Sequence, residues 1–254
     1  MPTTSAASEA GSALIARIRE RRRRAGIFLD FDGTLSEIVA LPELATVVPS
    51  AASELSRLTD EYGLVAVVSG RPAAQVRTLV GVPGVEAFGL YGLEGADEQP
   101  AAGSVIADAE RAARGVPGAH VERKGASVAL HYRLASDPAE AGHRLAAAAA
   151  AIARRHGLKV LPGKMVLELV PPEVPGKGAV VLREVRRRGL AGALFAGDDR
   201  ADVDAFIALD GLSELGVPTA KVAVRSDESP PELLAGADLV VDGPSGLVGL
   251  LRTL

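Results

Sequence analysis

Short apolar runs alternate with amphipathic stretches along the first third of the chain. Apolar runs at 27–31, 64–68 and 87–91 flank helical patterns at 51–62 and 73–80. Apolar runs bounded by turn residues predict buried strands, and the helical patterns between them predict crossover connections. The order therefore predicts βαβ units and a parallel sheet.

The pattern changes after Glu94, where a polar, turn-forming stretch at 97–103 predicts a domain boundary. Beyond it the chain predicts helices at 107–114 and 138–156, with strands at 128–132, 159–161 and 166–170. Strands paired beside two helices form a small α+β layer. A proline-rich segment containing Pro171, Pro172 and Pro175 predicts the second boundary.

The βα alternation then resumes to the end of the pattern. Helices are predicted at 177–188 and 201–209, and strands at 193–196, 222–224 and 239–241. The fold class is therefore α/β, with one parallel core over residues 1–101 and 172–254, interrupted by an inserted α+β domain over residues 102–171.

Composition narrows the function classes. The chain has 254 residues, 48% hydrophobic and 24% charged, and no apolar run reaches the length of a bilayer. It lacks cysteine, which excludes disulfides and thiolate chemistry and suits a cytoplasmic location. The net charge of −4 argues against nucleic acid as a partner. The apolar spacing of Leu14, Ile15 and Ile18 predicts an amphipathic helix and not a secretory signal. No membrane contact and no obligate protein partner are evident.

The segment from Phe28 to Leu35 places two carboxylates, Asp30 and Asp32, after an apolar run. In open parallel sheets, ligands bind outside the carboxyl ends of the strands, where these residues are expected. Gly33 permits a sharp turn, and Thr34 offers a hydroxyl and an N–H to a phosphate oxygen. A bare Asp-Gly pair would indicate only a solvated turn, but the full string is more specific.

Two further segments follow predicted strands or open predicted helices. Ser69, Gly70 and Arg71 come directly after the apolar run 64–68, so Ser69 is expected at the same sheet edge. Lys177 opens a predicted helix and is one of only five lysines among 28 basic residues. Taken singly, the first is an ordinary strand-to-helix turn and the second a solvated cation at a helix start.

Four carboxylates, Asp198, Asp199, Asp202 and Asp204, gather after the predicted strand at 193–196. An acidic helix cap explains one or two of them but not all four. Such a cluster repels itself without a cation. Oxygen-only ligands favour a hard cation, so the sequence predicts Mg²⁺.

Taken in order, these segments resemble the four motifs of the haloacid dehalogenase superfamily of phosphohydrolases. The resemblance implies that Asp30 is the nucleophile and Asp32 the general acid and base, with Lys177 neutralising charge. It implies that Thr34, Ser69, Gly70 and Arg71 bind the phosphate. It further implies that Mg²⁺ is held at the acidic cluster, and the predicted metal-binding residues are Asp30, Asp32, Asp198, Asp199 and Asp202.

The inserted segment resembles the cap of the trehalose-6-phosphate phosphatase family. The resemblance rests on residues 122–133 and 163–168 together with the acidic segment from Gly197 to Asp202. It implies that the substrate is a small-molecule sugar phosphate whose hydroxyls are bound by Glu122, Lys124, Arg133 and Glu168. The four histidines share no spacing and are interpreted as structural or surface residues.

Two alternatives remain open. Another sugar phosphate, such as sucrose 6-phosphate or a mannosyl phosphoglycerate, would suit the same polar cap. A non-catalytic homologue that binds a sugar phosphate is the other, although every expected nucleophile, acid and ligand is present. For the cap residues, exposed strand positions forming surface ion pairs are the plainer explanation.

Overall fold

The computed structural model describes residues 4–39, 42–94 and 101–254. It divides into two compact units, Met1–Gly92 with Pro175–Leu254, and Leu93–Val174. The predicted insertion, 102–171, lies within the second unit. The polar segment on which the first boundary was placed falls partly at 95–100, outside the described residues.

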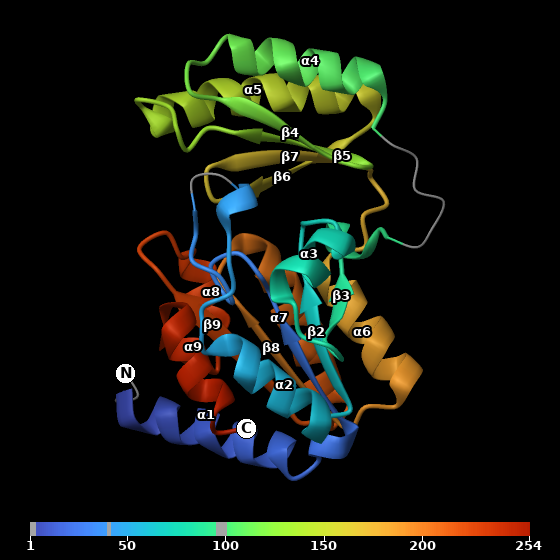
Figure 1. The fold of residues 1–254 in the computed structure, drawn as a ribbon, viewed down its shortest axis with the longest axis vertical. Helices are drawn as coiled ribbons and strands as arrows, with labels where there is room; N and C mark the ends of the chain where they lie inside the picture. The colour runs from blue at the N-terminus through green and yellow to red at the C-terminus, as the bar shows by residue number, and fades with distance from the viewer. Residues whose placement is uncertain (1–3, 40–41, 95–100) are drawn as a thin grey trace. The chain divides into compact units, whose positions relative to one another are not determined.

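A six-stranded, all-parallel sheet forms the centre of the first unit, in the order β10-β9-β8-β1-β2-β3 (Figure 1). Its strands are β1 (Ala25–Leu29), β2 (Leu64–Val68), β3 (Glu86–Phe88), β8 (Gly192–Gly197), β9 (Thr219–Arg225) and β10 (Leu239–Asp242). The inner strands β1, β2 and β8 are buried along their whole length, as expected for parallel strands covered on both faces. The predicted parallel core is confirmed.

Helices cover both faces of this sheet. They are α1 (Thr4–Arg19), α2 (Ala51–Glu61), α3 (Ala73–Val80), α6 (Lys177–Arg188), α7 (Val203–Glu214), α8 (Pro231–Gly236) and α9 (Gly243–Leu251). One apolar cluster joins α1, α2, α3 and α9 to the sheet, and a second joins α6, α7 and α8 to the other face. The predicted N-terminal helix is confirmed, with Ile15 and Ile18 in the first cluster.

The second unit is one antiparallel sheet covered by two helices on one face (Figure 1). Its strand order is β4-β5-β7-β6. The elements are α4 (Gly103–Arg114), β4 (His120–Lys124), β5 (Ser127–His131), α5 (Pro138–His156), β6 (Lys159–Gly163) and β7 (Val166–Val170). Val128, Leu130, Leu167 and Leu169 face the helices, so the alternate residues of these strands lie on the opposite face.

Two local differences from the sequence prediction have physical causes. Strand β4 was not predicted, because Val121 is its single aliphatic residue. The strand predicted at 87–91 ends at Phe88, because Leu90 and Tyr91 adopt positive φ angles of 48° and 55°. In the described part of the chain, no helix is both long and apolar enough to cross a membrane.

Candidate functional site

The parallel register brings two of the predicted acids to one edge of the sheet. Strand β1 pairs with β8 through Phe28 with Phe195 and Leu29 with Ala196, so both strands end at the same level. The Asp30 N–H continues this ladder by donating to the Ala196 carbonyl at 2.9 Å. Asp30 therefore lies beside Asp198, which follows β8, and both side chains are buried.

Three buried carboxylates meet at this edge. Asp30, Asp198 and Asp202 each place one oxygen within 4.8 Å of the others. The Lys177 Nζ lies between two of them, at 2.7 Å from Asp30 Oδ1 and 2.6 Å from Asp202 Oδ1. One ammonium cannot neutralise three carboxylates. The cluster therefore has excess negative charge, which a hard divalent cation would balance.

Burial and neighbouring charges shift the pKa values of both Asp30 and Lys177. Burial is the largest influence on Asp30 and, with repulsion from Asp202 and Asp198, it raises the pKa well above the usual value despite Lys177. For Lys177, burial acts to lower the pKa, but attraction to Asp202 and Asp30 outweighs it and leaves the pKa raised. Lys177 is therefore a fixed cation. A further positive charge at this edge would favour the ionised form of Asp30.

Asp202 holds this cluster together through hydrogen bonds. Its Oδ2 accepts the backbone N–H groups of Asp198 and Asp199, both at 2.9 Å, and its Oδ1 accepts from Lys177. A side chain at Gly197 would collide with the Asp202 carboxylate, so the strand end must be glycine. Asp202, predicted as a metal ligand, thus already binds the loop that carries Asp198.

Two of the predicted metal ligands lie outside this group of three. The Asp199 carboxylate is half-buried and accepts the Arg200 N–H at 2.7 Å, as a cap of the following turn. The Asp32 carboxylate is 43% exposed and accepts two hydrogen bonds from Arg71. Asp204 has a supporting role, because it accepts the Gly178 N–H at 2.8 Å at the start of the helix that carries Lys177.

Arg71 contacts the predicted general acid directly. Its Nε lies 2.7 Å from Asp32 Oδ2 and its Nη2 lies 2.6 Å from Asp32 Oδ1, a two-pronged ion pair. The guanidinium carbon also lies 5.3 Å from the centre of the Phe31 ring, within the range of a cation–π contact. The residue was predicted to bind phosphate, and the structure places it on a carboxylate.

The other predicted phosphate-binding residues line the same edge. Thr34 is fully buried, and its hydroxyl lies 3.4 Å from Asp198 Oδ1. Ser69, buried at the end of β2, accepts the Arg71 N–H at 3.1 Å. Gly33 has a φ of +80°, and a Cβ there would lie 1.9 Å from Asp198 Oδ2. Glycine is required at this turn for the close approach of the two loops.

In the second unit, three of the four predicted sugar-binding residues meet on the sheet face away from the helices. Lys124 Nζ lies 3.5 Å from Glu168 Oε2 and 3.7 Å from Glu122 Oε2. Glu168 and Lys124 are buried, whereas Glu122 is partly exposed. The fourth, Arg133, donates from Nη2 to the Lys164 carbonyl at 3.2 Å.

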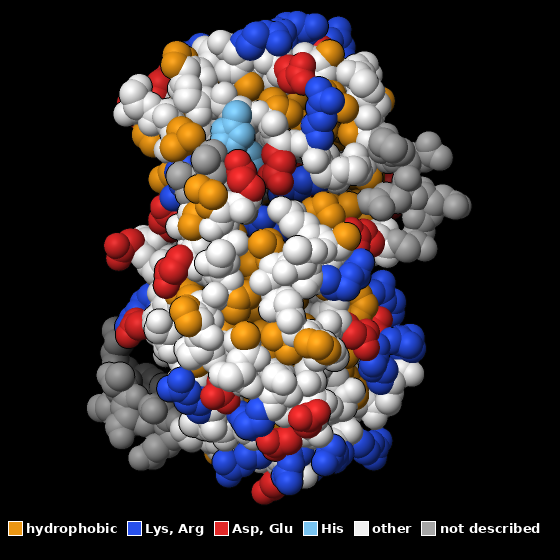
Figure 2. All heavy atoms as spheres, in the orientation of Figure 1, with side chains coloured by type: hydrophobic (Ala, Val, Ile, Leu, Met, Phe, Trp, Pro, Cys, Tyr) orange, Lys and Arg blue, Asp and Glu red, His pale blue; other side chains and the backbone are white. Residues whose placement is uncertain are grey.

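Two neighbours of the row formed by Glu122, Lys124 and Glu168 were missed by the sequence reasoning. His131 Nε2 lies 2.8 Å from Glu122 Oε2, and the ring stacks on His120 with centroids 4.8 Å apart. Figure 2 shows histidine side chains beside acidic ones on the second unit. Ser127 donates its hydroxyl to Glu168 Oε1 at 2.7 Å. Ser127 and His131 are an even number of positions apart on β5, so they lie on the same face of the sheet. This two-residue spacing was the signal available in the sequence.

Comparisons with solved structures agree with this architecture. The C-terminal domain of C. albicans trehalose-6-phosphate phosphatase has a TM-score of 0.81 at 21% identity, covering 96% of each chain. A haloacid dehalogenase-like hydrolase from Bacteroides thetaiotaomicron has a TM-score of 0.62 at 15% identity, covering 90% of this chain and 98% of that one. The fold is therefore that of the haloacid dehalogenase-like hydrolases, as predicted.

Sequence comparison narrows this class. A family model described as trehalose-phosphatase matches residues 28–232. The trehalose-phosphate phosphatase of Mycobacterium avium is 38% identical over 242 residues, which cover 88% of this chain. The matched region is 60% of that protein's length. The chain belongs to the trehalose-phosphatase family, which confirms the resemblance seen in the sequence.

Proposed function

We propose that this chain hydrolyses trehalose 6-phosphate to trehalose and inorganic phosphate, through a covalent phosphate on Asp30. The observation that carries the proposal is the buried cluster of Asp30, Asp198 and Asp202 around Lys177, in a chain of this family. The name of the M. avium relative supports the substrate. The absence of cysteine suits a cytoplasmic location.

The acidic cluster fits a magnesium ion. Its ligands are oxygens only, and three buried carboxylates face one ammonium, so a divalent cation would compensate charge that Lys177 alone leaves unbalanced. Asp30, Asp198 and the main-chain carbonyl of Asp32 would hold it. When bound, the ion supplies positive charge to Asp30 and to the phosphoryl oxygens.

In the first half-reaction, the Asp30 carboxylate attacks phosphorus, and the bond between phosphorus and the sugar oxygen breaks. Asp32 donates its proton to that oxygen, which leaves as a sugar hydroxyl. Lys177 neutralises charge beside the nucleophile, where its Nζ is 2.7 Å from Asp30. Thr34, Ser69 and Gly70 bind the phosphoryl oxygens through hydroxyl and backbone N–H groups.

In the second half-reaction, Asp32 accepts a proton from a water molecule, which attacks the phosphorus of the aspartyl phosphate. The bond to Asp30 breaks, inorganic phosphate leaves, and both carboxyl groups return to their starting states. One side chain therefore serves as acid and then as base, which requires that Asp32 be oriented toward both oxygen atoms in turn.

The row on the second unit supports recognition of a sugar. Glu122, Lys124 and Glu168 offer both donors and acceptors on one sheet face, as a substrate with many hydroxyls requires. Arg133, which donates to the Lys164 carbonyl, is proposed to bind the sugar together with them.

The test is phosphate release from a panel of substrates with Mg²⁺ present. We expect trehalose 6-phosphate to have the highest kcat/KM, above sucrose 6-phosphate and a mannosyl phosphoglycerate. A different preferred sugar would overturn the substrate while keeping the reaction class. Absence of turnover even with p-nitrophenyl phosphate would favour the non-catalytic, sugar-phosphate-binding alternative.

A further inference from the structure

We infer that Arg71 is a positioning residue, which orients the Asp32 carboxylate for proton transfer and does not act on the phosphate itself. The inference rests on the proposed function, because it assumes that Asp32 is the acid and base. It reassigns a residue that the sequence pattern placed among the phosphate ligands. The contact that carries it is the two-pronged pair of Arg71 with Asp32, at 2.7 and 2.6 Å.

Asp32 needs an external restraint. It follows the buried strand β1 by three residues, in a turn, and its side chain is 43% exposed. A carboxylate at such a position samples several rotamers unless something holds it. A planar guanidinium that binds both oxygens fixes the plane and direction of the carboxylate, which a single point charge cannot do.

Arg71 is itself held firmly enough to provide that restraint. Its side chain is only 5% exposed and lies over the Phe31 ring. Its backbone N–H donates to the Ser69 hydroxyl, and its carbonyl accepts the Leu90 N–H at 3.0 Å. The Arg71 backbone is therefore anchored to the end of β2 and to the turn at Leu90, and its guanidinium is held against the Phe31 ring.

The strained turn strengthens this anchor. Leu90 and Tyr91 both have positive φ angles, which are strained for residues with side chains. Their N–H groups donate to the carbonyls of Arg71 and Ser69. A Cβ at Gly70 would lie 2.5 Å from the Tyr91 hydroxyl, so the two loops are closely packed. The strain is retained where it fixes the segment that carries Arg71.

The geometry also separates the two possible roles. Two nitrogens of the guanidinium already bind Asp32, whereas a phosphate-binding arginine would direct this fork toward the substrate. Because both Asp32 oxygens are engaged, one hydrogen bond must open when an oxygen turns to the leaving group or to water. The second bond then acts as the pivot that keeps the carboxylate in reach.

A double-mutant cycle with two substrates tests this inference. The proteins are wild type, Arg71→Gln, Asp32→Asn and the double variant, each with Mg²⁺. Steady-state phosphate release from trehalose 6-phosphate reports both half-reactions. The pre-steady-state burst of p-nitrophenolate from p-nitrophenyl phosphate reports the first half-reaction alone, with a leaving group that needs no proton.

We expect Arg71→Gln to lower steady-state turnover of trehalose 6-phosphate about 10- to 100-fold, the scale of a misoriented catalytic group. The nitrophenolate burst should stay within about twofold of wild type, because attack by Asp30 on that substrate does not require Asp32. In the Asp32→Asn background, Arg71→Gln should cause no further loss, since a residue that acts through Asp32 has nothing left to orient.

Equal losses in both backgrounds, or a reduced burst, would show that Arg71 acts on the phosphate and would overturn the inference. Unchanged turnover in Arg71→Gln would overturn it as well. If Arg71→Gln does not fold, Arg71→Lys replaces it in the cycle, and the same non-additive loss with an intact burst is expected. If the wild-type protein shows no turnover of either substrate, the proposed function itself is overturned.

Discussion

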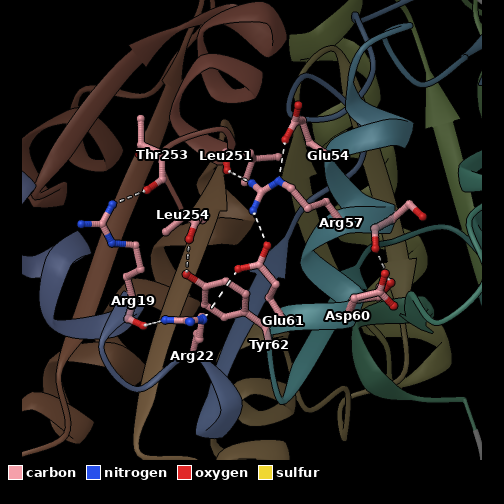
Figure 3. A network of polar contacts seen from close by, with 12 residues as sticks. Arg19, Arg22, Glu54, Arg57, Asp60, Glu61, Tyr62, Leu251, Thr253 and Leu254 are labelled. Carbon is pink, nitrogen blue, oxygen red and sulfur yellow. Dashed lines mark hydrogen bonds and ion pairs between the residues drawn. The ribbon is translucent and has the colours of Figure 1, made fainter.

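Two charged clusters of the first unit differ in how their charges are balanced. In the network of Figure 3, Arg57 donates to Glu54, Glu61 and the Leu251 carbonyl. Arg22 and Arg252 pair with the same two glutamates, so cations and anions compensate each other. These side chains are partly exposed, and their attraction is screened by solvent.

The carboxylate cluster at the sheet edge has the opposite character. Asp30, Asp198 and Asp202 are almost fully buried and face the single ammonium of Lys177. A fold gains no stability from holding like charges together in this way. The first cluster therefore compensates its own charges, whereas the second has excess negative charge and could hold a metal ion.

The largest effect is expected from substitution of Asp30, the proposed nucleophile in the carboxylate cluster. We expect Asp30→Asn to reduce turnover of trehalose 6-phosphate and of p-nitrophenyl phosphate by about a thousandfold or more, because an amide cannot form the phosphoenzyme. Phosphate release measures the loss. The melting temperature should not fall, since the change removes one of three mutually repelling charges. Retention of substantial turnover would contradict the assignment of Asp30.

Metal removal is the next largest effect. Chelation by EDTA should abolish turnover, and Mg²⁺ should restore it. In a thermal melt, Mg²⁺ at about 100 times its Kd should stabilise the wild type by about 2.7 kcal/mol. The Asp198→Asn variant should lose most of this shift, yet should melt no lower than wild type when both are metal-free. Full activity in chelator would contradict the account of the cluster.

A smaller, substrate-dependent effect is expected on the second unit. Glu168→Ala or Lys124→Ala should lower kcat/KM for trehalose 6-phosphate by about tenfold to a hundredfold, the scale of about 1–3 kcal/mol for an unpaired buried group. Hydrolysis of p-nitrophenyl phosphate, which lacks the sugar, should change much less.

The matched control is Arg123→Ala. Arg123 lies between Glu122 and Lys124 on β4, and its partner is Glu110, at 2.6 Å. Because successive strand residues point to opposite faces, this change should leave both activities near wild type. Equal losses on both substrates in Glu168→Ala would mean that the row supports the fold and not recognition of the sugar.

The smallest effect is expected in the network of Figure 3, where cations and anions compensate each other. The Tyr62 hydroxyl donates to the Leu254 carbonyl at 3.2 Å, so Tyr62→Phe should reduce the free energy of unfolding by about 0.5–1.5 kcal/mol. Turnover at saturating substrate should stay unchanged. Denaturant melts of the two proteins give the difference, and a loss of activity without a loss of stability would contradict the separation of the two clusters.

The same tyrosine gives a pH dependence with a defined sign. Burial, with the nearby charge of Glu61, raises the pKa of Tyr62 to about 12 from its ordinary value of 10.0. The folded state thus favours the protonated phenol. Its contribution to stability is complete below pH 10 and is lost as the pH rises toward 12. Tyr62→Phe should remove that part of the alkaline decline.

Much of this architecture was predictable because local signals agreed. The ranges predicted for β2, β7, α3, α5 and α6 match the structure. For α5, Pro138 stands at the first turn, Asp137 accepts the Glu140 N–H, and Gly157 ends the helix with a φ of 67°. Such signals are read directly from neighbouring residues. The motif acids Asp30 and Asp198 met as expected because parallel strands end at one edge.

What could not be predicted depends on tertiary packing. Helix α9 begins with Gly243 and Pro244 and contains Gly246, a composition typical of turns, but Leu247 and Leu251 are fully buried against the sheet. Arg71 pairs with Asp32, which lies 39 positions away in the sequence. No local sequence pattern specifies which carboxylate a distant arginine will bind. The contacts of His131 and Ser127 depend equally on the register of strands.

The most direct test of the central claim is to trap the phosphoenzyme. The Asp32→Asn variant, incubated with Mg²⁺ and p-nitrophenyl phosphate and quenched in acid, should accumulate one phosphoryl group, because its second half-reaction lacks a base. Peptide mass spectrometry should locate that group on Asp30, and Asp30→Asn should show none. A phosphoryl group on another residue, or turnover by Asp32→Asn at the wild-type rate, would contradict the account.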